Sequence, residues 1–264
     1  MIRLFWEMVK RSFRRYMTYR AATFAGLMTN FFFGLFRVAV LLALLDNRSD
    51  ISGYTAQRVI VYTGFTQAML SLLGIFGWWD LMISIHNGDV GSDLLKPMDF
   101  FKYWLAQDLG RALVNLLLRG ILFMLLFELA YDLTYPQTAV HWLIVSISIM
   151  LSWLISFGFR FLVNLAAFWT PNAKGIGRFG FVMAWFFSGQ LMPLRLFPDW
   201  VQTIAAFTPF PHMLNTVVEL YIGIIDGPAA WVALLTQLIW AISLVIICQF
   251  VLKTAVRRLV ILGG

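Results

Sequence analysis

The sequence contains little charge. Only 12% of its 264 residues are Asp, Glu, Lys or Arg, whereas 61% are hydrophobic and the mean hydropathy is +0.80. Soluble proteins carry roughly 25% charged residues. The composition therefore excludes an ordinary soluble domain and predicts an all-α polytopic membrane protein.

Side chains that carry chemistry are also scarce. The single cysteine, Cys248, excludes an intrachain disulfide, and the three histidines lie in three different segments. The sequence has no phosphate-binding G-x-x-x-x-G-K-S/T loop, no H-E-x-x-H zinc motif and no G-x-S-x-G nucleophile turn. Gly175, Gly177 and Gly180 spell G-x-G-x-x-G, but no strand precedes them, so we interpret them as a flexible turn. We therefore expect no catalytic site, no metal site and no enzymatic activity in this chain.

Long apolar segments divide the chain. Crossing about 30 Å of hydrocarbon takes about 20 helical residues. On that basis the sequence predicts six transmembrane helices, near residues 21–45, 59–85, 110–131, 140–167, 179–192 and 230–252. The stretches between them are too short to form a core of their own, so we treat residues 1–264 as one transmembrane domain.

The first residues of the chain are amphipathic. Ile2, Phe5, Val9 and Phe13 recur at steps of three and four, and most basic residues fall on the opposite side. This pattern predicts an interfacial helix over residues 1–20, with its basic side toward the headgroups of membrane lipid. The alternative is a plain basic leader that only fixes the orientation of the first span.

Prolines break residues 193–229 into apolar pieces that are too short to cross a membrane. The clearest pieces, 200–207 and 212–221, cover only about 12–15 Å at 1.5 Å per residue. We predict a re-entrant outer helical hairpin between spans five and six, with its turn at residues 209–211. The alternative is one proline-kinked span over 179–207, which would make the number of crossings odd.

The distribution of Lys and Arg predicts the orientation of the chain. With the N-terminus inside, three basic residues fall on the outer side: Arg48, Arg58 and Arg195. Fourteen fall on the inner side: Arg3, Lys10, Arg11, Arg14, Arg15, Arg20, Lys96, Lys102, Arg111, Lys174, Arg178, Lys253, Arg257 and Arg258. We therefore predict a multi-pass protein of the cell inner (plasma) membrane with both termini in the cytoplasm. Because topology accounts for the net charge of +7, we expect no nucleic-acid partner.

The most polar stretch, residues 86–109, joins spans two and three on the inner side. Glycine and proline punctuate it, which predicts a bent loop with short helical pieces. Asp89 and Asp93 are four residues apart and share one face of a short helix, beside the apolar pair Leu94 and Leu95. A short polar elbow of this kind suits a soluble partner. We predict that the coupling surface consists of Gly88, Asp89, Asp93, Leu94, Leu95 and Lys96.

A few polar and charged residues lie within the predicted spans, where each is a functional candidate. Arg119 lies near the middle of span three, one helical turn after Asn115, and Arg160 and Asn164 form a similar pair in span four. We predict that these four residues line a substrate path. The alternative, which the sequence leaves open, is that the arginines form structural ion pairs between helices. The candidate partners for such pairs are Asp80 and Glu128.

Two stretches resemble one known family. Gly88-Asp89 followed by Asp93-Leu94-Leu95-Lys96-Pro97 is similar to the inner loop of type-two ABC exporter permeases. Residues 186–223 resemble the same family, because Ser-Gly is followed by Pro-x-x-x-x-Pro-x-Trp, a short helix, a proline-rich turn and a closing glycine. The resemblance covers the whole chain in the number and order of spans. The closest likeness is to a subgroup of about this length that contains uncharacterised ABC exporter permeases and some members with viologen-type drug export.

The resemblance implies the permease subunit of an exporter but does not identify its substrate. Because the predicted path has aromatic and apolar residues and few acidic ones, we expect an amphipathic or hydrophobic substrate that moves outward. The resemblance also implies a second permease, the same or paralogous, and separate ABC ATPase subunits that bind ATP and Mg²⁺, so that this chain itself would bind no cofactor. The N-terminal helix and the loop over 86–109 would receive the ATPase. Two alternatives from other classes are an ion-coupled secondary transporter and a membrane-embedded enzyme.

Overall fold

The computed structural model of the protein describes residues 2–18, 20–45, 49–75 and 77–258. In these ranges the chain is helical, and its only β pairing is an isolated bridge between Ile51 and Tyr54. Arg48, which the sequence assigns to the outer side, lies outside the described residues. The elements are α1 (Ile2–Met17), α2 (Arg20–Leu45), α3 (Ala56–Leu73), α4 (Asp80–His86), α5 (Val90–Leu94), α6 (Phe100–Asn115), η1 (Leu116–Ile121), α7 (Leu122–Ala130), α8 (Ala139–Leu165), η2 (Ala166–Phe168), α9 (Ala173–Phe187), η3 (Leu194–Leu196), α10 (Asp199–Ala206), α11 (Phe210–Met213), α12 (Asn215–Tyr221) and α13 (Gly227–Val256).

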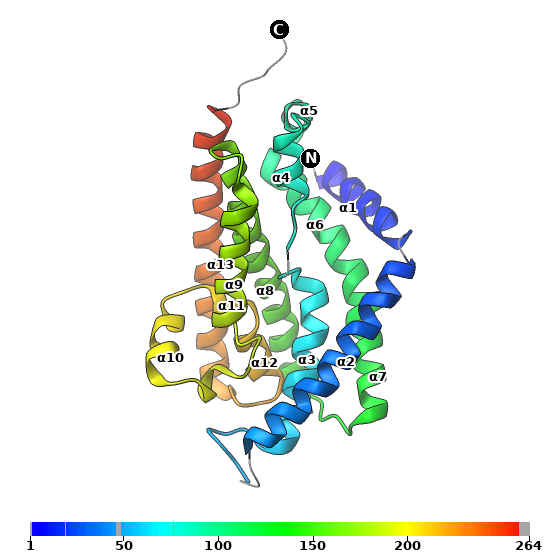
Figure 1. The fold of residues 1–264 in the computed structure, drawn as a ribbon, viewed down its shortest axis with the longest axis vertical. Helices are drawn as coiled ribbons and strands as arrows, with labels where there is room; N and C mark the ends of the chain where they lie inside the picture. The colour runs from blue at the N-terminus through cyan, green and yellow to red at the C-terminus, as the bar shows by residue number, and fades with distance from the viewer. Residues whose placement is uncertain (1, 19, 46–48, 76, 259–264) are drawn as a thin grey trace.

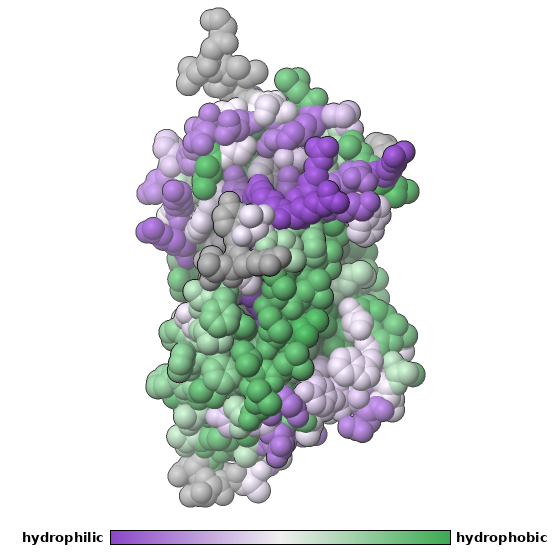
Figure 2. Space-filling view, turned by 90° about the vertical axis from the view of Figure 1, so that its right-hand side faces the viewer, coloured by the Kyte–Doolittle hydropathy of each residue, from purple (hydrophilic) through white to green (hydrophobic). Residues whose placement is uncertain are grey.

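Four helical stretches in the described part of the chain are long and apolar enough to cross a membrane: Thr23–Leu45, Phe100–Ala130, Ala139–Phe168 and Gly227–Val256. They run roughly along the long axis of the molecule (Figure 1). Figure 2 shows a broad apolar band around the middle of the molecule and a concentration of hydrophilic residues at the end that carries α5. Together these features identify a multi-pass helical membrane protein.

The predicted second span is not one helix. Helix α3 ends at Leu73, where Gly74 adopts the left-handed conformation with φ 63°, and Gly77 also has a positive φ of 130°. A residue with a side chain rarely adopts such angles, so the two glycines permit a break before α4 begins at Asp80. The prediction of one uninterrupted transmembrane helix over residues 59–85 is therefore wrong. The glycine pair is the sequence signal for the break.

The predicted third span begins ten residues too late. Helix α6 starts at Phe100 because Asp99 caps it, its carboxylate accepting a hydrogen bond from the Lys102 backbone N at 3.0 Å. The helix then continues through the π-helical turn η1 to the end of α7 at Ala130. The second half of the predicted loop over 86–109 is therefore helix, and Asp108 lies more than two turns inside it.

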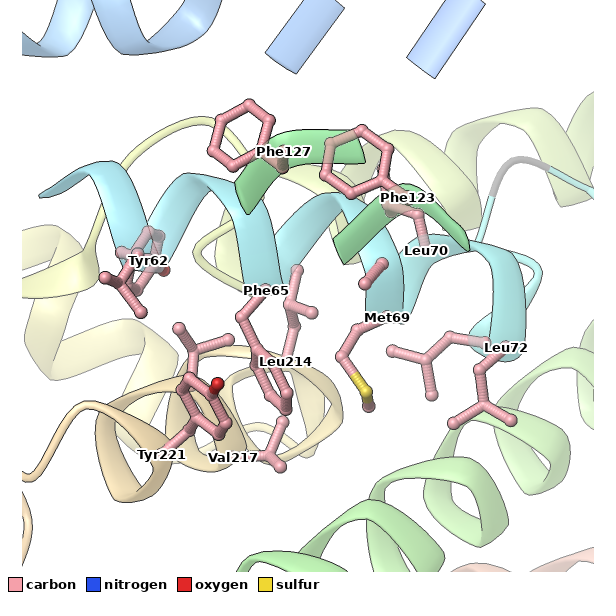
Figure 3. Packing of buried hydrophobic residues seen from close by; sticks show 14 of the residues in the cluster. Tyr62, Phe65, Met69, Leu70, Leu72, Phe123, Phe127, Leu214, Val217 and Tyr221 are labelled. Carbon is pink, nitrogen blue, oxygen red and sulfur yellow. The ribbon is translucent and has the colours of Figure 1, made fainter. Parts of the chain in front are cut away.

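Helix α3 lies at the centre of the largest apolar cluster. Figure 3 shows its residues Phe65 and Met69 between Phe123 of α7 on one side and Tyr221 of α12 on the other. The rings of Phe65 and Tyr221 stack with centroids 4.0 Å apart. Fourteen of the 18 residues of α3 are buried, so protein rather than lipid surrounds it. A helix in that position tolerates the polar residues that lower its hydropathy.

The segment after α9 follows the predicted pieces with one difference. Helix α10 matches the predicted piece 200–207, but the piece 212–221 is divided into α11 and α12 at Leu214, where φ is −140° and ψ is −60°. Gly223, with φ 69°, follows the end of α12 as its closing residue. All seven residues of α12 are buried, and α11 and α12 pack against α8.

Candidate functional site

Asp108 is the centre of a buried polar cluster between α6 and α8. Arg160 donates from Nη1 and Nη2 to both carboxylate oxygens at 2.8 Å each, and Arg111 Nε donates to Oδ1 at 2.8 Å. The indole Nε1 of Trp153 donates to Oδ2 at 2.9 Å. The side chains of Asp108 and Arg160 are 0% exposed. Such a bidentate pair with further donors is the geometry in which buried charges are tolerated.

The same cluster satisfies the backbone at the break between α3 and α4. Arg111 Nη2 donates to the Leu72 carbonyl at 3.1 Å, and Ser156 Oγ donates to the Leu73 carbonyl at 2.9 Å. Backbone groups freed by a broken helix need such partners in lipid. The arginine–aspartate cluster therefore supports the break as well as joining two helices.

Asn164 continues this support on the α4 side of the break. Its Nδ2 donates to the Trp78 carbonyl at 2.8 Å, and its Oδ1 accepts from the Met82 backbone N at 2.9 Å. Arg160 and Asn164, both predicted to line a substrate path, are thus fully buried and bonded to protein.

The partner of Arg160 is an aspartate that the sequence analysis assigned to the cytoplasmic loop. The carboxylates proposed as partners lie elsewhere: Asp80 accepts from Arg15 Nη2 at 3.3 Å, and Glu128 accepts from the Tyr135 hydroxyl at 2.5 Å. The i, i+3 spacing of Asp108 and Arg111 was the available signal. A helix that begins near residue 110 leaves Asp108 in the loop, so the spacing does not predict an ion pair within the helix.

A second polar region, the Arg119 chamber, lies between α2, α3 and the α6–η1 helix. Its volume is about 320 Å³, and its lining consists of Asn30, Leu70, Ser71, Gly74, Gly77, Arg111, Asn115 and Arg119. Arg119 belongs to the π-helical turn, an irregularity that is frequent at functional sites. Its guanidinium lies against Gly26, where an added Cβ would stand 2.0 Å from Nη2. Two of the four predicted path residues, Asn115 and Arg119, therefore share this chamber.

The elbow between α4 and α6 is partly packed and partly exposed. Asp93 is buried and accepts from Ser84 Oγ at 3.2 Å and from Lys96 Nζ at 2.5 Å. The Lys96 ammonium lies 3.8 Å from the centroid of the Tyr103 ring on α6. Although partial burial disfavours its charge, the hydrogen bonds to Asp93 and Tyr103 raise the pKa of Lys96. These contacts tie the elbow to α6.

The predicted coupling residues divide accordingly. Gly88 and Asp89 are exposed at the turn before α5, and the Leu95 side chain is 87% exposed. Leu94 packs against a buried apolar cluster instead. The large apolar side chain that the elbow exposes is therefore that of Leu95.

Helix α1 lies along α6 at the same end of the molecule as α5 (Figure 1). Ser12 Oγ donates to the Gln107 carbonyl at 2.6 Å. Gly110 makes the close approach possible, since a Cβ there would stand 2.6 Å from the Val9 carbonyl oxygen. Lys10 and Arg11 are exposed on the other side of α1.

A third polar cluster joins α12 to its neighbours near the opposite end. Glu219 is 3% exposed and accepts from the Tyr54 hydroxyl at 2.9 Å and from Arg195 Nε at 3.0 Å. The Tyr62 hydroxyl bonds Asn215 Oδ1 at 3.0 Å. Sequence reasoning missed this cluster because Glu219 is a single acid in an apolar run.

Comparison with known proteins identifies a family. The family model described as ABC-2 family transporter protein matches residues 27–263, a range that begins within α2 and includes every later element. No curated protein matches the chain.

Proposed function

The chain belongs to the ABC-2 family of transporter proteins, and from this premise we propose that it is the permease subunit of an ATP-binding-cassette exporter. It moves an amphipathic or hydrophobic substrate outward, while separate ABC ATPase subunits bind ATP and Mg²⁺ and hydrolyse the nucleotide. The observation that carries the proposal is the family match over residues 27–263. A second permease, the same or paralogous, completes the complex.

The proposed topology has six crossings with both termini in the cytoplasm of a cell bounded by the inner (plasma) membrane. Four crossings are the long apolar helices, and the others are the buried α3 with α4 and the 15-residue α9. Helix α9 alone is about 22 Å long, short of the about 30 Å of hydrocarbon. Helices α10 to α12 re-enter the outer half as a hairpin, and α1 lies in the inner interface.

The ATPase docks on the end that carries α1 and α5. There Gly88, Asp89 and Leu95 are exposed, while Asp93 and Lys96 tie the elbow to the rest of the domain. A force applied to Leu95 passes through these bonds into α4 and α6, on either side of the elbow. An exposed apolar side chain on a fixed support is the kind of anchor that partner proteins bind.

The substrate path runs through the Arg119 chamber. Asn115 and Arg119 contact the substrate there, while Arg160 and Asn164 hold the broken helix that forms one wall. Asn115 and Arg119 therefore line the proposed path, whereas Arg160 and Asn164 are buried behind its wall and have a positioning role.

The test is to purify the tagged full-length chain from its native membranes and identify its companions by mass. We expect an ABC ATPase subunit, and export that requires ATP. ATP hydrolysis by the chain alone, or gradient-driven transport without any ATPase, would contradict the proposal.

The docking surface has its own test in the same complex. Leu95→Asp should release the ATPase or uncouple it, while the permease stays folded, because the side chain touches little of its own protein. Ser92→Asp is the matched control, since it adds the same charge at another exposed position of the elbow. Normal ATPase recovery and export in Leu95→Asp would show that the partner docks elsewhere.

A further inference from the structure

We infer that the Arg119 chamber binds an oxyanion, a phosphate or carboxylate, and that the substrate is therefore an amphiphile with an anionic head group. That the bound amphiphile is the transport substrate rests on the proposed function. Binding of the anion itself follows from the residues of the chamber. Three features of the chamber support this binding: the charge around it, the free donors in it, and the space that is kept open.

The charge around the chamber is positive. Arg111 and Arg160 share the single carboxylate of Asp108, which leaves that cluster with one positive charge in excess. Arg119 adds a second, since no described residue forms an ion pair with it. None of the described residues that line the chamber is acidic. Uncompensated cations at this depth are costly, and an anionic ligand would supply the missing counter-charge.

The donors in the chamber are free. Among the described residues, the side chains of Asn30, Ser71, Asn115 and Arg119 have no hydrogen-bond partner, and Ser71 Oγ and Arg119 Nε are buried. Arg111 uses Nε and Nη2 on protein, which leaves Nη1 available. Buried polar groups in proteins are almost always paired. The two buried unpaired groups, with the half-buried Asn30 and Asn115 beside them, are accounted for by a ligand that accepts hydrogen bonds.

The space is held open by the backbone. Gly74 and Gly77 of the break line the chamber without side chains to fill it, and the π-helical turn carries Arg119. Gly26 leaves room for the guanidinium, since any side chain there would overlap Nη2. A planar guanidinium with free edges matches the two oxygens of a carboxylate or phosphate. The chamber of about 320 Å³ accommodates such a head group.

The experiment measures binding to the purified full-length chain in neutral detergent by native mass spectrometry. The probes are phosphatidic acid, phosphatidylcholine with the same acyl chains, a dialkyl dimethylammonium lipid and inorganic phosphate. We expect phosphatidic acid to bind about tenfold or more tightly than the zwitterionic and cationic lipids, as charge-assisted hydrogen bonds predict. Inorganic phosphate should compete only weakly, because it lacks the apolar part.

Three variants locate the site. Arg119→Gln should abolish the preference for phosphatidic acid and leave phosphatidylcholine binding unchanged, whereas Arg119→Lys should keep part of it. Arg178→Gln removes the same charge from an exposed position of α9 and should keep the full preference. Equal binding of all lipids by the unaltered chain, or equal loss in Arg119→Gln and Arg178→Gln, would overturn the inference. Inorganic phosphate binding as tightly as phosphatidic acid would overturn its amphiphile part.

These results are independent of the ATPase. If anion binding holds but no ATPase accompanies the chain, the proposed function fails and the binding site stands. If an ATPase is recovered but no anion preference exists, the permease stands and this inference fails.

Discussion

Arg160 and Arg119 lie in predicted spans of the same domain, yet their surroundings are opposite. Arg160 is completely buried, and its guanidinium makes a bidentate pair with Asp108. Arg119 has no hydrogen-bond partner among the described residues and lines a chamber. Sequence alone treats the two arginines alike, since both are cations one turn from an asparagine.

The difference teaches how to separate a structural charge from a ligand-binding one. A buried cation that holds helices together has its counter-charge in the protein, and removing either partner leaves the other unpaired. A cation that binds a ligand is left without such a counter-charge, so its loss costs the fold little. Substitutions at Asp108, Glu219 and Gly26 should therefore have progressively smaller effects on stability.

The largest effect is expected at Asp108. Asp108→Asn removes the carboxylate that three side chains donate to, and it leaves Arg111 and Arg160 as uncompensated neighbours. We expect the free energy of unfolding to fall by about 3–5 kcal/mol, as is usual when one partner of a buried ion pair is removed. Thermal unfolding of the full chain in detergent measures it. Asp226→Asn, at an exposed residue, is the control and should be neutral.

The polar cluster around Glu219 should be less sensitive than the Asp108 cluster. Glu219→Gln keeps an acceptor for the Tyr54 hydroxyl but loses the charge that pairs with Arg195, whose side chain is 45% exposed. Because water can hydrate Arg195, we expect the free energy of unfolding to fall by only about 1–2 kcal/mol in the same assay. A loss of stability as large as that of Asp108→Asn would show that the exposure of Arg195 does not determine how much stability is lost.

The smallest stability effect is expected at Gly26. In Gly26→Ala the new methyl group overlaps the end of the Arg119 side chain, which is flexible and moves aside. Helix propensity favours alanine by up to about 1 kcal/mol, so stability should hardly change. Binding of phosphatidic acid should nevertheless fall about tenfold, since the guanidinium is displaced. Gly91→Ala, which meets no atom within 4 Å, is the control.

Composition and periodicity predicted the membrane class, the helical fold and the N-terminal helix as far as Met17. They also predicted α8 and α13 to within a few residues at each end, because a long apolar helix can be recognised from its own sequence. The short helix α10 was recognisable from its flanking prolines. These elements depend on local residues.

The Asp108 cluster and the chamber depend on contacts between distant segments. Asp108 meets Arg160 across 52 residues, and Arg119 lies against Gly26 on another helix. No spacing within one helix encodes such neighbours. The start of α6 was a local error instead: Asp99 is a capping residue, and recognising it places Asp108 within the helix. The role of Arg119 and Asn115 in transport stays a prediction.

The most direct test compares Arg160→Gln and Arg119→Gln in one preparation, measuring both thermal stability and the preference for phosphatidic acid over phosphatidylcholine. Arg160→Gln should lower the unfolding temperature by several degrees, because Asp108 loses its bidentate partner. Arg119→Gln should unfold at or above the temperature of the unaltered chain and lose the preference. Equal destabilisation in both variants, with the preference retained in Arg119→Gln, would contradict the distinction between a structural and a ligand-binding arginine.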